Sequence, residues 1–222
     1  MKKYNRIISV SNSVMELYSS RDYIKTSVIR NGVESESESE SEKKYDFIYA
    51  GSISYRKQVR LLCESFFEYN KEGKYNLCVL GDGPDLLELK DKYQSEYIFF
   101  KGSVGNVFAY LNQSKFFISP SLSEGLPNAV LEAYSLGLPC LLSNIGPHME
   151  LVSGCDVLEK LSFNINKADI VRSLTLANSL SRSDCSLASI FEKNLISSEL
   201  NALVMSNKHF DLYEEVILFN GK

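Results

Sequence analysis

Two glutamates eight positions apart, Glu124 and Glu132, are the residues of this chain best placed to do chemistry together. The apolar run at 116–118 predicts a buried strand before them. Pro127 predicts the first residue of a helix, where its missing N–H would have no partner anyway. Glu124 would then lie in the loop between strand and helix, and Glu132 inside the helix. Each carboxylate could accept hydrogen bonds from ligand hydroxyls.

The start of that helix could also hold an anion. Free backbone amides and the helix dipole favour negative charge at a helix start, and Gly125 would let a ligand approach the backbone closely. A ligand with hydroxyls at both ends and an anion between them is a nucleotide sugar. The alternative is that the two glutamates are ordinary helix residues, since this spacing occurs in many helical proteins.

The elements that must position these groups begin at residue 45, where short apolar runs start to alternate with helical patterns. Strands are predicted at 47–50, 77–80, 97–100, 116–118 and 139–142. Helices are predicted at 57–69, after Pro84 as far as residue 93, and around 107–111. The first of them should bury four side chains, Val59, Leu62, Phe66 and Phe67.

This alternation predicts an α/β fold, a Rossmann-like parallel sheet covered by helices on both faces. Ligands of such sheets lie outside the carboxyl ends of the strands. The turns expected to gather at that edge are those at Gly51, Gly81, Gly102 and Gly125.

The two ends of the chain give weaker signals. Strands are predicted at 6–10 and 26–29, with a short helix between them capped by Ser11 or Ser13. Residues 34–42 alternate Glu and Ser, which predicts a disordered surface loop, with a charged recruitment tag as the alternative. Helices are predicted at 167–178 and 210–219, and the serine-rich stretch between them has no clear assignment.

Composition argues against a nucleic-acid partner. The formal net charge is −4, and leaving out the five glutamates of the Glu-Ser repeat makes it +1. The five cysteines form no C-x-x-C pair and are expected to be buried free thiols in a reducing compartment. Residues 1–6 lack the apolar core of a signal peptide, so a cytoplasmic location is expected, with the inner face of the membrane as an option.

Residues 124–133, followed by Gly137-Leu138-Pro139, resemble the E-x7-E signature of the family-four retaining glycosyltransferases. Weaker similarities follow the family order at 7–11, 28–33, 51–57, 79–84 and 210–217. The resemblance implies the nucleotide-sugar-binding half of a GT-B enzyme. It also implies that a hexosyl group passes from a nucleotide diphosphate sugar to a glycan or lipid-linked acceptor, with retention at the anomeric carbon.

The resemblance also implies roles for particular residues. Glu124 and Lys57 would be catalytic, with no metal and no cofactor beyond the nucleotide sugar. Donor contacts would come from Gly51, Ser52, Arg56, Gly81, Gly83, Gly125, Leu126, Pro127, Asn128 and Glu132. Residues 1–33 would be the crossover into the donor domain, 34–44 the loop, and 45–222 the donor domain itself.

The chain departs from the family pattern in two ways. It begins where the family's second domain begins, so the acceptor-binding half should be a separate domain or chain, which could also bring the protein to a membrane surface. The alternative function is a catalytically incomplete binding subunit or remnant.

Ser52 stands where the family commonly has Arg. Arg56 could replace that charge or be solvated, and Lys57 could be an exposed helix lysine. His148 could line the site or lie on the surface.

Overall fold

The computed structural model of the protein describes residues 6–17, 25–34 and 41–220. Five parallel strands form its main sheet in the spatial order β5–β4–β3–β6–β7. They are β3 (Tyr45–Ala50), β4 (Leu77–Leu80), β5 (Ile98–Gly102), β6 (Ser114–Ser119) and β7 (Cys140–Leu142). The sheet order reverses between β3 and β6, and the carboxyl edge at such a reversal is where open parallel sheets bind ligands.

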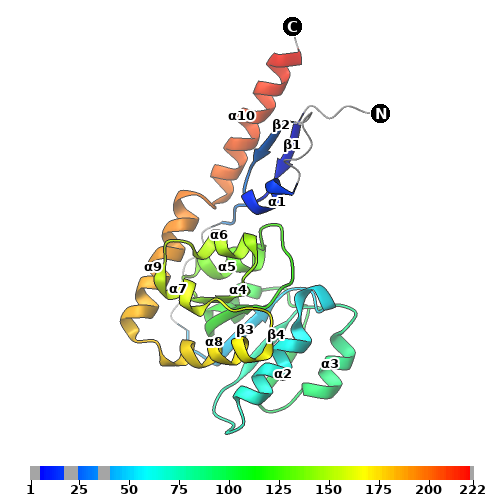
Figure 1. Ribbon diagram of the computed structural model, residues 1–222, viewed down its shortest axis with the longest axis vertical. Coiled ribbons are helices and arrows are strands. Elements are labelled where there is room, and N and C mark those ends of the chain that lie inside the picture. The colour runs from blue at the N-terminus through cyan, green and yellow to red at the C-terminus, as the bar shows by residue number, and fades with distance from the viewer. Residues whose placement is uncertain (1–5, 18–24, 35–40, 221–222) are drawn as a thin grey trace.

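Helices cover both faces of this sheet (Figure 1). Right-handed crossovers place α2 (Val59–Tyr69) and α5 (Asn128–Ser135) on opposite faces, because β4 and β7 lie on opposite sides of the β3–β6 pair. α2 packs against α8 (Lys167–Ser179), and α5 packs against α9 (Arg182–Ser198). The other helices of the body are α3 (Leu86–Tyr93), α4 (Val107–Asn112), α6 (Gly146–Val152) and α7 (Asp156–Leu161).

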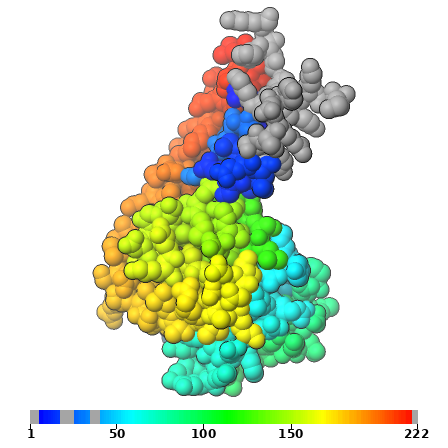
Figure 2. All heavy atoms as spheres, in the orientation of Figure 1, coloured from blue at the N-terminus to red at the C-terminus, as the bar shows by residue number. Residues whose placement is uncertain are grey.

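A smaller unit consists of β1 (Arg6–Ser9), α1 (Asn12–Glu16) and β2 (Lys25–Val28), whose two strands pair in parallel. The final helix, α10 (Ala202–Asn220), runs past β2 and away from the main sheet (Figure 1), and in Figure 2 the two form a projection above the body. Glu150 of α6 holds the unit by accepting hydrogen bonds from the amides of Asn12 and Ser13, at 3.1 and 2.7 Å.

The predicted α/β fold is confirmed, and each of the five main strands lies within two residues of its predicted bounds. Ser11 caps α1 as expected, accepting a hydrogen bond from the amide of Val14 at 3.3 Å. The prediction that Phe67 faces inward is wrong, since it is 72% exposed while Phe66 is fully buried. Consecutive helix positions point about 100° apart, and Phe67 falls outside the face on which α2 buries Val59, Leu62 and Phe66.

Three helix starts also differ from the prediction. The helix predicted from Lys57 begins at Val59, because Gln58 has a left-handed backbone (φ 54°) after a 3₁₀ turn, η1 (Tyr55–Lys57). Pro127 lies one residue before α5 rather than in its first turn. α10 begins at Ala202, well before the predicted start at 210.

The remaining sequence expectations have mixed outcomes. The serine-rich stretch forms α9, which starts with a capping box between Ser181 and Asp184. Four cysteines are buried free thiols, as expected, but Cys185 is partly exposed. None of the described helices is long and apolar enough to cross a membrane. Residues 35–40, most of the predicted Glu-Ser loop, lie outside the described ranges.

Candidate functional site

The loops after β3 and β6 meet where the strand order reverses. Two hydrogen bonds join them. The amide of Leu122 donates to the carbonyl of Arg56 at 2.9 Å, and the Arg56 guanidinium donates to the carbonyl of Ser123 at 2.7 Å. Arg56 therefore belongs to the site, although about half of its side chain (51%) remains exposed to solvent.

Glu124 lies between two cations. Its Oε1 accepts a hydrogen bond from Lys57 Nζ at 2.5 Å, and its Oε2 is 3.3 Å from Arg56 Nη1. Only 7% of the Glu124 side chain and 16% of the Lys57 side chain are exposed, so Lys57 is not an ordinary surface lysine. Burial would raise the pKa of Glu124, but hydrogen bonds from Lys57 and Ser121 and the two positive charges hold it below its ordinary value. Glu124 is therefore an ionised acceptor at neutral pH.

Glycines let the loops at this edge pack closely. Gly81 has a φ of 125°, and a Cβ there would lie 1.8 Å from the carbonyl oxygen of Gly51. A Cβ on Gly83 would lie 2.3 Å from the backbone of the loop after β3. A Cβ on Gly125 would lie 2.9 Å from the side chain of Val10, so the smaller unit of β1, α1 and β2 approaches this glycine closely. The backbone contacts at Gly81 and Gly83 require glycine there whether or not a ligand also approaches.

The first turn of α5 offers hydrogen-bond donors. Within the ranges that the structure describes, no hydrogen bond engages the backbone N–H groups of Asn128 and Ala129. Asn31, which follows β2, fixes this turn with its side-chain amide, donating to the carbonyl of Leu126 at 3.2 Å and to Asn128 Oδ1 at 2.9 Å. Two free amides at a positive helix end could bind an anion.

Glu132 lies inside α5 and is partly buried. Burial raises its pKa, and the structure gives it no ion pair with any described residue. Its backbone carbonyl accepts a hydrogen bond from the Ser135 hydroxyl at 2.7 Å, and this bond does not involve the carboxylate. A carboxylate of this kind is available to accept hydrogen bonds from a diol.

Tyr49 and His148 are buried close enough to Glu124 for its charge to affect their pKa. The Tyr49 hydroxyl donates to the carbonyl of Ser52 at 2.7 Å, and burial followed by the Glu124 charge raises its pKa. The expectation of a surface position for His148 is wrong. Its Nδ1 lies 3.0 Å from both oxygens of Ser143, and burial lowers its pKa to about 4.

The structure thus brings the predicted residues of the two loops together, and it adds residues that the sequence did not single out. Asn31 stands in an Asn-Gly pair after the strand predicted at 26–29, a pattern that predicts a turn and gives no sign of its contacts with α5. Ser121 and Ser143 carried no such signal, because serines in loops are common. Within the described residues, no three His, Cys, Asp or Glu side chains could hold a metal ion. The expectation of metal-free chemistry stays a prediction.

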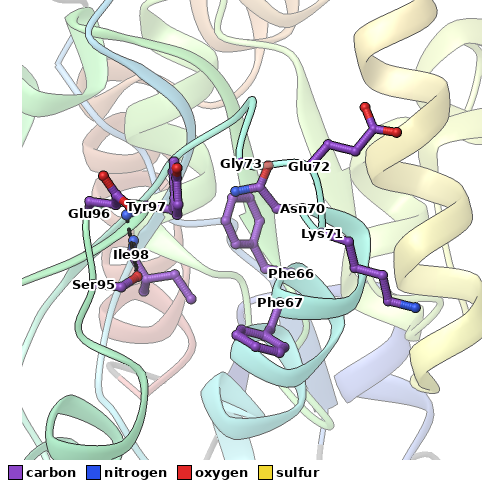
Figure 3. Close-up of a pocket in the computed structure, with 10 residues that line it drawn as sticks. All are labelled: Phe66, Phe67, Asn70, Lys71, Glu72, Gly73, Ser95, Glu96, Tyr97 and Ile98. Carbon is purple, nitrogen blue, oxygen red and sulfur yellow. Dashed lines mark hydrogen bonds between the residues drawn. The ribbon is translucent and has the colours of Figure 1, made fainter.

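The cavity in Figure 3 lies elsewhere, at the amino ends of β4 and β5. Its volume is about 630 Å³, and Phe66, Phe67 and Tyr97 supply aromatic walls. Asn70 is already bonded to the backbone of the turn at 74–75, and Ser95 accepts from the amide of Tyr97. The charged residues of the lining, Lys71, Glu72 and Glu96, are all exposed to solvent, and we place the chemistry at the β3–β6 edge.

A family model described as "Glycosyl transferases group 1" matches residues 44–171. A UDP-Gal:alpha-D-GlcNAc-diphosphoundecaprenol alpha-1,3-galactosyltransferase of Escherichia coli is 28% identical over 242 residues, covering 96% of this chain and 61% of that protein. The Escherichia coli O-antigen biosynthesis glycosyltransferase WbnH is 30% identical over 157 residues, covering 70% of this chain and 40% of that protein. The chain therefore matches only 40% to 61% of the length of these relatives.

Solved structures show the same fold. The structure of Anabaena Alr3699/HepE in complex with UDP and glucose superposes with a TM-score of 0.82 at 13% identity, covering 95% of this chain and 63% of that one. Staphylococcus aureus TarM, in a complex that contains UDP, gives a TM-score of 0.77 at 18% identity over 94% of this chain and 44% of that one. Both are GT-B proteins, and the shared part is the Rossmann-like domain with its flanking elements.

Proposed function

The chain belongs to the group 1 glycosyltransferases, and we propose that it binds a nucleotide diphosphate sugar at the β3–β6 edge. In this proposal the hexosyl group passes from the nucleotide diphosphate to a glycan or lipid-linked acceptor, with retention at the anomeric carbon. The observation that carries the proposal is the cluster of Lys57, Arg56 and Glu124 at the point where the strand order reverses. Retention rests on the resemblance of residues 124–133 to the family-four signature.

Charge builds on the diphosphate as the glycosidic bond to it breaks. Lys57 and the free amides of Asn128 and Ala129 are the donors available to stabilise that charge. Ser52 stands where the family commonly has arginine. Arg56 would supply the second positive charge instead. Fixed donors of this kind could do what a metal ion does in other transferases.

The two carboxylates would each contact a different part of the rest of the ligand. Glu124 is ionised and held by both loops, which suits it to accept hydrogen bonds from sugar hydroxyls. Glu132, with no charge partner among the described residues, would accept from the ribose diol. The base and sugar are open; UDP-galactose is the first donor to test, because a relative's name specifies UDP-Gal.

The acceptor would be bound by a separate domain or chain. The chain matches only part of the length of its relatives, and α10 carries exposed apolar side chains along the projection in Figure 2. Leu203, Phe210 and Ile217 are 69%, 61% and 70% exposed and follow one another at seven-residue spacing, so they share a face of the helix. This face is our proposed contact with that domain.

Calorimetric titration tests the proposal directly. The purified chain would be titrated with UDP, GDP, ADP and dTDP and with a sugar conjugate of each. We expect one nucleoside diphosphate to bind and its sugar conjugate to bind more tightly. Binding of none of the eight would overturn the proposal, and the anomeric configuration of any transfer product, read by NMR, would test retention.

A further inference from the structure

A row of buried polar groups connects His148 to the loop that carries Glu124. Ser121, Ser143 and His148 are all fully buried. The Ser143 hydroxyl donates to the carbonyl of Ser121 at 2.7 Å, and His148 Nδ1 lies 3.0 Å from Ser143 Oγ and 3.0 Å from its carbonyl oxygen. Ser121 lies three residues before Glu124 in the loop after β6, so these contacts anchor the loop that carries the carboxylate.

The hydrogen bonds fix which nitrogen of His148 carries the proton. The Ser143 hydroxyl already uses its hydrogen on Ser121, and the Ser143 carbonyl can only accept. His148 Nδ1 must therefore donate, and Nε2 is the bare nitrogen. Nε2 is buried without a hydrogen-bond partner in the structure.

The unpartnered Nε2 argues that His148 is more than core packing. A buried polar atom without a partner is destabilising, and an apolar side chain of similar size would avoid that loss. Nδ1 is the nitrogen that is bonded, so we look for the role of the ring there. Burial also lowers the pKa of His148 to about 4, which keeps the ring neutral beside the Lys57 ammonium at neutral pH.

We propose that His148 is a positioning residue, which acts through Ser143 and Ser121 to hold the Glu124 carboxylate where a sugar hydroxyl can reach it. The chain of contacts joins the end of β7 to the loop after β6. It therefore fixes that loop from the β7 side, while Lys57 and Arg56 hold it from the β3 side. The inference rests on the proposed role of Glu124 in sugar binding. It predicts that the preference for nucleotide sugar over nucleotide depends on Nδ1 and not on Nε2.

Two substitutions separate the nitrogens. Asn can donate from an amide at about the position of Nδ1, whereas Gln places its amide at about the position of Nε2. His148→Asn should keep the wild-type affinity for UDP-galactose, and His148→Gln should lose about tenfold, the size of one weakened hydrogen bond to a charged group. Ser143→Ala should lose UDP-galactose affinity to the same extent. The double variant with His148→Gln should lose little more than either single variant, because both substitutions break the same connection between His148 and the loop after β6.

The measurement is calorimetry of each full-length variant with UDP and with UDP-galactose, and with GDP and GDP-mannose as a second pair. UDP affinity should stay unchanged in all variants, which separates positioning from a general loss of folding; melting temperatures give the same control. A greater loss in His148→Asn than in His148→Gln, or an unchanged preference in His148→Gln and Ser143→Ala, would overturn the inference alone. Absence of any sugar preference in the wild type would overturn the role of Glu124 as well.

Discussion

Replacing Lys57 by Met should destabilise the ligand-free protein, because Lys57 neutralises a buried carboxylate. Glu124 is 7% exposed, and Lys57 Nζ donates to it at 2.5 Å. Breaking a buried pair outright costs about 3–5 kcal/mol, but Arg56 would still lie 3.3 Å from the other carboxylate oxygen. We therefore expect a loss of about 1.5–3 kcal/mol, the range for a hydrogen bond to a charged group.

The pH dependence of that loss follows from the pKa of Glu124. Its folded pKa lies below the ordinary value of 4.5, so its ion pair stabilises the protein above that value and stops doing so as the pH falls through the folded pKa. Urea denaturation of wild type and Lys57→Met should show the full difference at neutral pH and a smaller one in acid. A difference that does not change with pH would refute this account of Lys57.

The same variant should weaken ligand binding in a particular way. Lys57→Met should lower UDP affinity about ten- to a hundredfold and leave uridine almost unaffected, because only UDP carries the diphosphate. The loss should shrink as salt rises. Lys74→Met is the matched control, since Lys74 is an exposed lysine paired with Glu72 near the amino end of β4. Equal losses in the two variants, or an unchanged UDP affinity in Lys57→Met, would assign Lys57 no part in the site.

Three further predictions follow from the same structure. Glu132→Ala should weaken UDP about ten- to a hundredfold, whereas Glu124→Ala should weaken only UDP-galactose; equal losses for both ligands in both variants, measured by calorimetry, would contradict this division. Burial raises the pKa of Glu192 well above its usual value, so the wild type should lose stability as pH rises above about 4.5, and Glu192→Gln should lose less, since only the raised pKa of Glu132 remains. Urea denaturation across that range checks the slope, and parallel slopes would show that Glu192 does not cause it. The purified chain should bind UDP-galactose but transfer little galactose to a lipid extract until lysate of the source cells supplies an acceptor-binding partner; robust transfer without the lysate would contradict that expectation.

Much of the fold could be predicted because its strands are short apolar runs, three of which (β3, β4 and β5) end in glycine turns. β4 is Leu77–Leu80 in both the prediction and the structure. α9 was harder to predict, because Glu192 lies on its buried face with Ala188 and Ile196, and the apolar Phe191 and Leu195 are only partly buried against the core. Its exposed face carries Leu187 and Ile190 instead. Burial of a glutamate and exposure of a leucine reverse the pattern from which a helix face is inferred.

The site could be predicted in part for a similar reason. Glu124 and Lys57 carry motif signals, but the reason that they meet is the order β3–β6 in the sheet, which no local pattern gives. Gln58 has a left-handed backbone that residue type does not favour, so the break before α2 had no signal. His148 shows the limit most clearly, because its partner Ser143 and the carbonyl of Ser121 come together only when β6 and β7 pair.

The ion pairs of Glu124 also bear on how a donor could enter. In the ligand-free protein, the cation proposed to bind the diphosphate is already neutralised by the carboxylate proposed to bind the sugar. We expect binding to be an exchange, in which Lys57 turns toward the diphosphate and sugar hydroxyls replace it at Glu124. Nucleoside diphosphate alone would draw Lys57 away without supplying those hydroxyls, so Arg56, at 3.3 Å, would be the remaining cation beside Glu124. The complete nucleotide sugar satisfies both charged groups at once, and this gives a physical reason for the site to prefer it to the diphosphate.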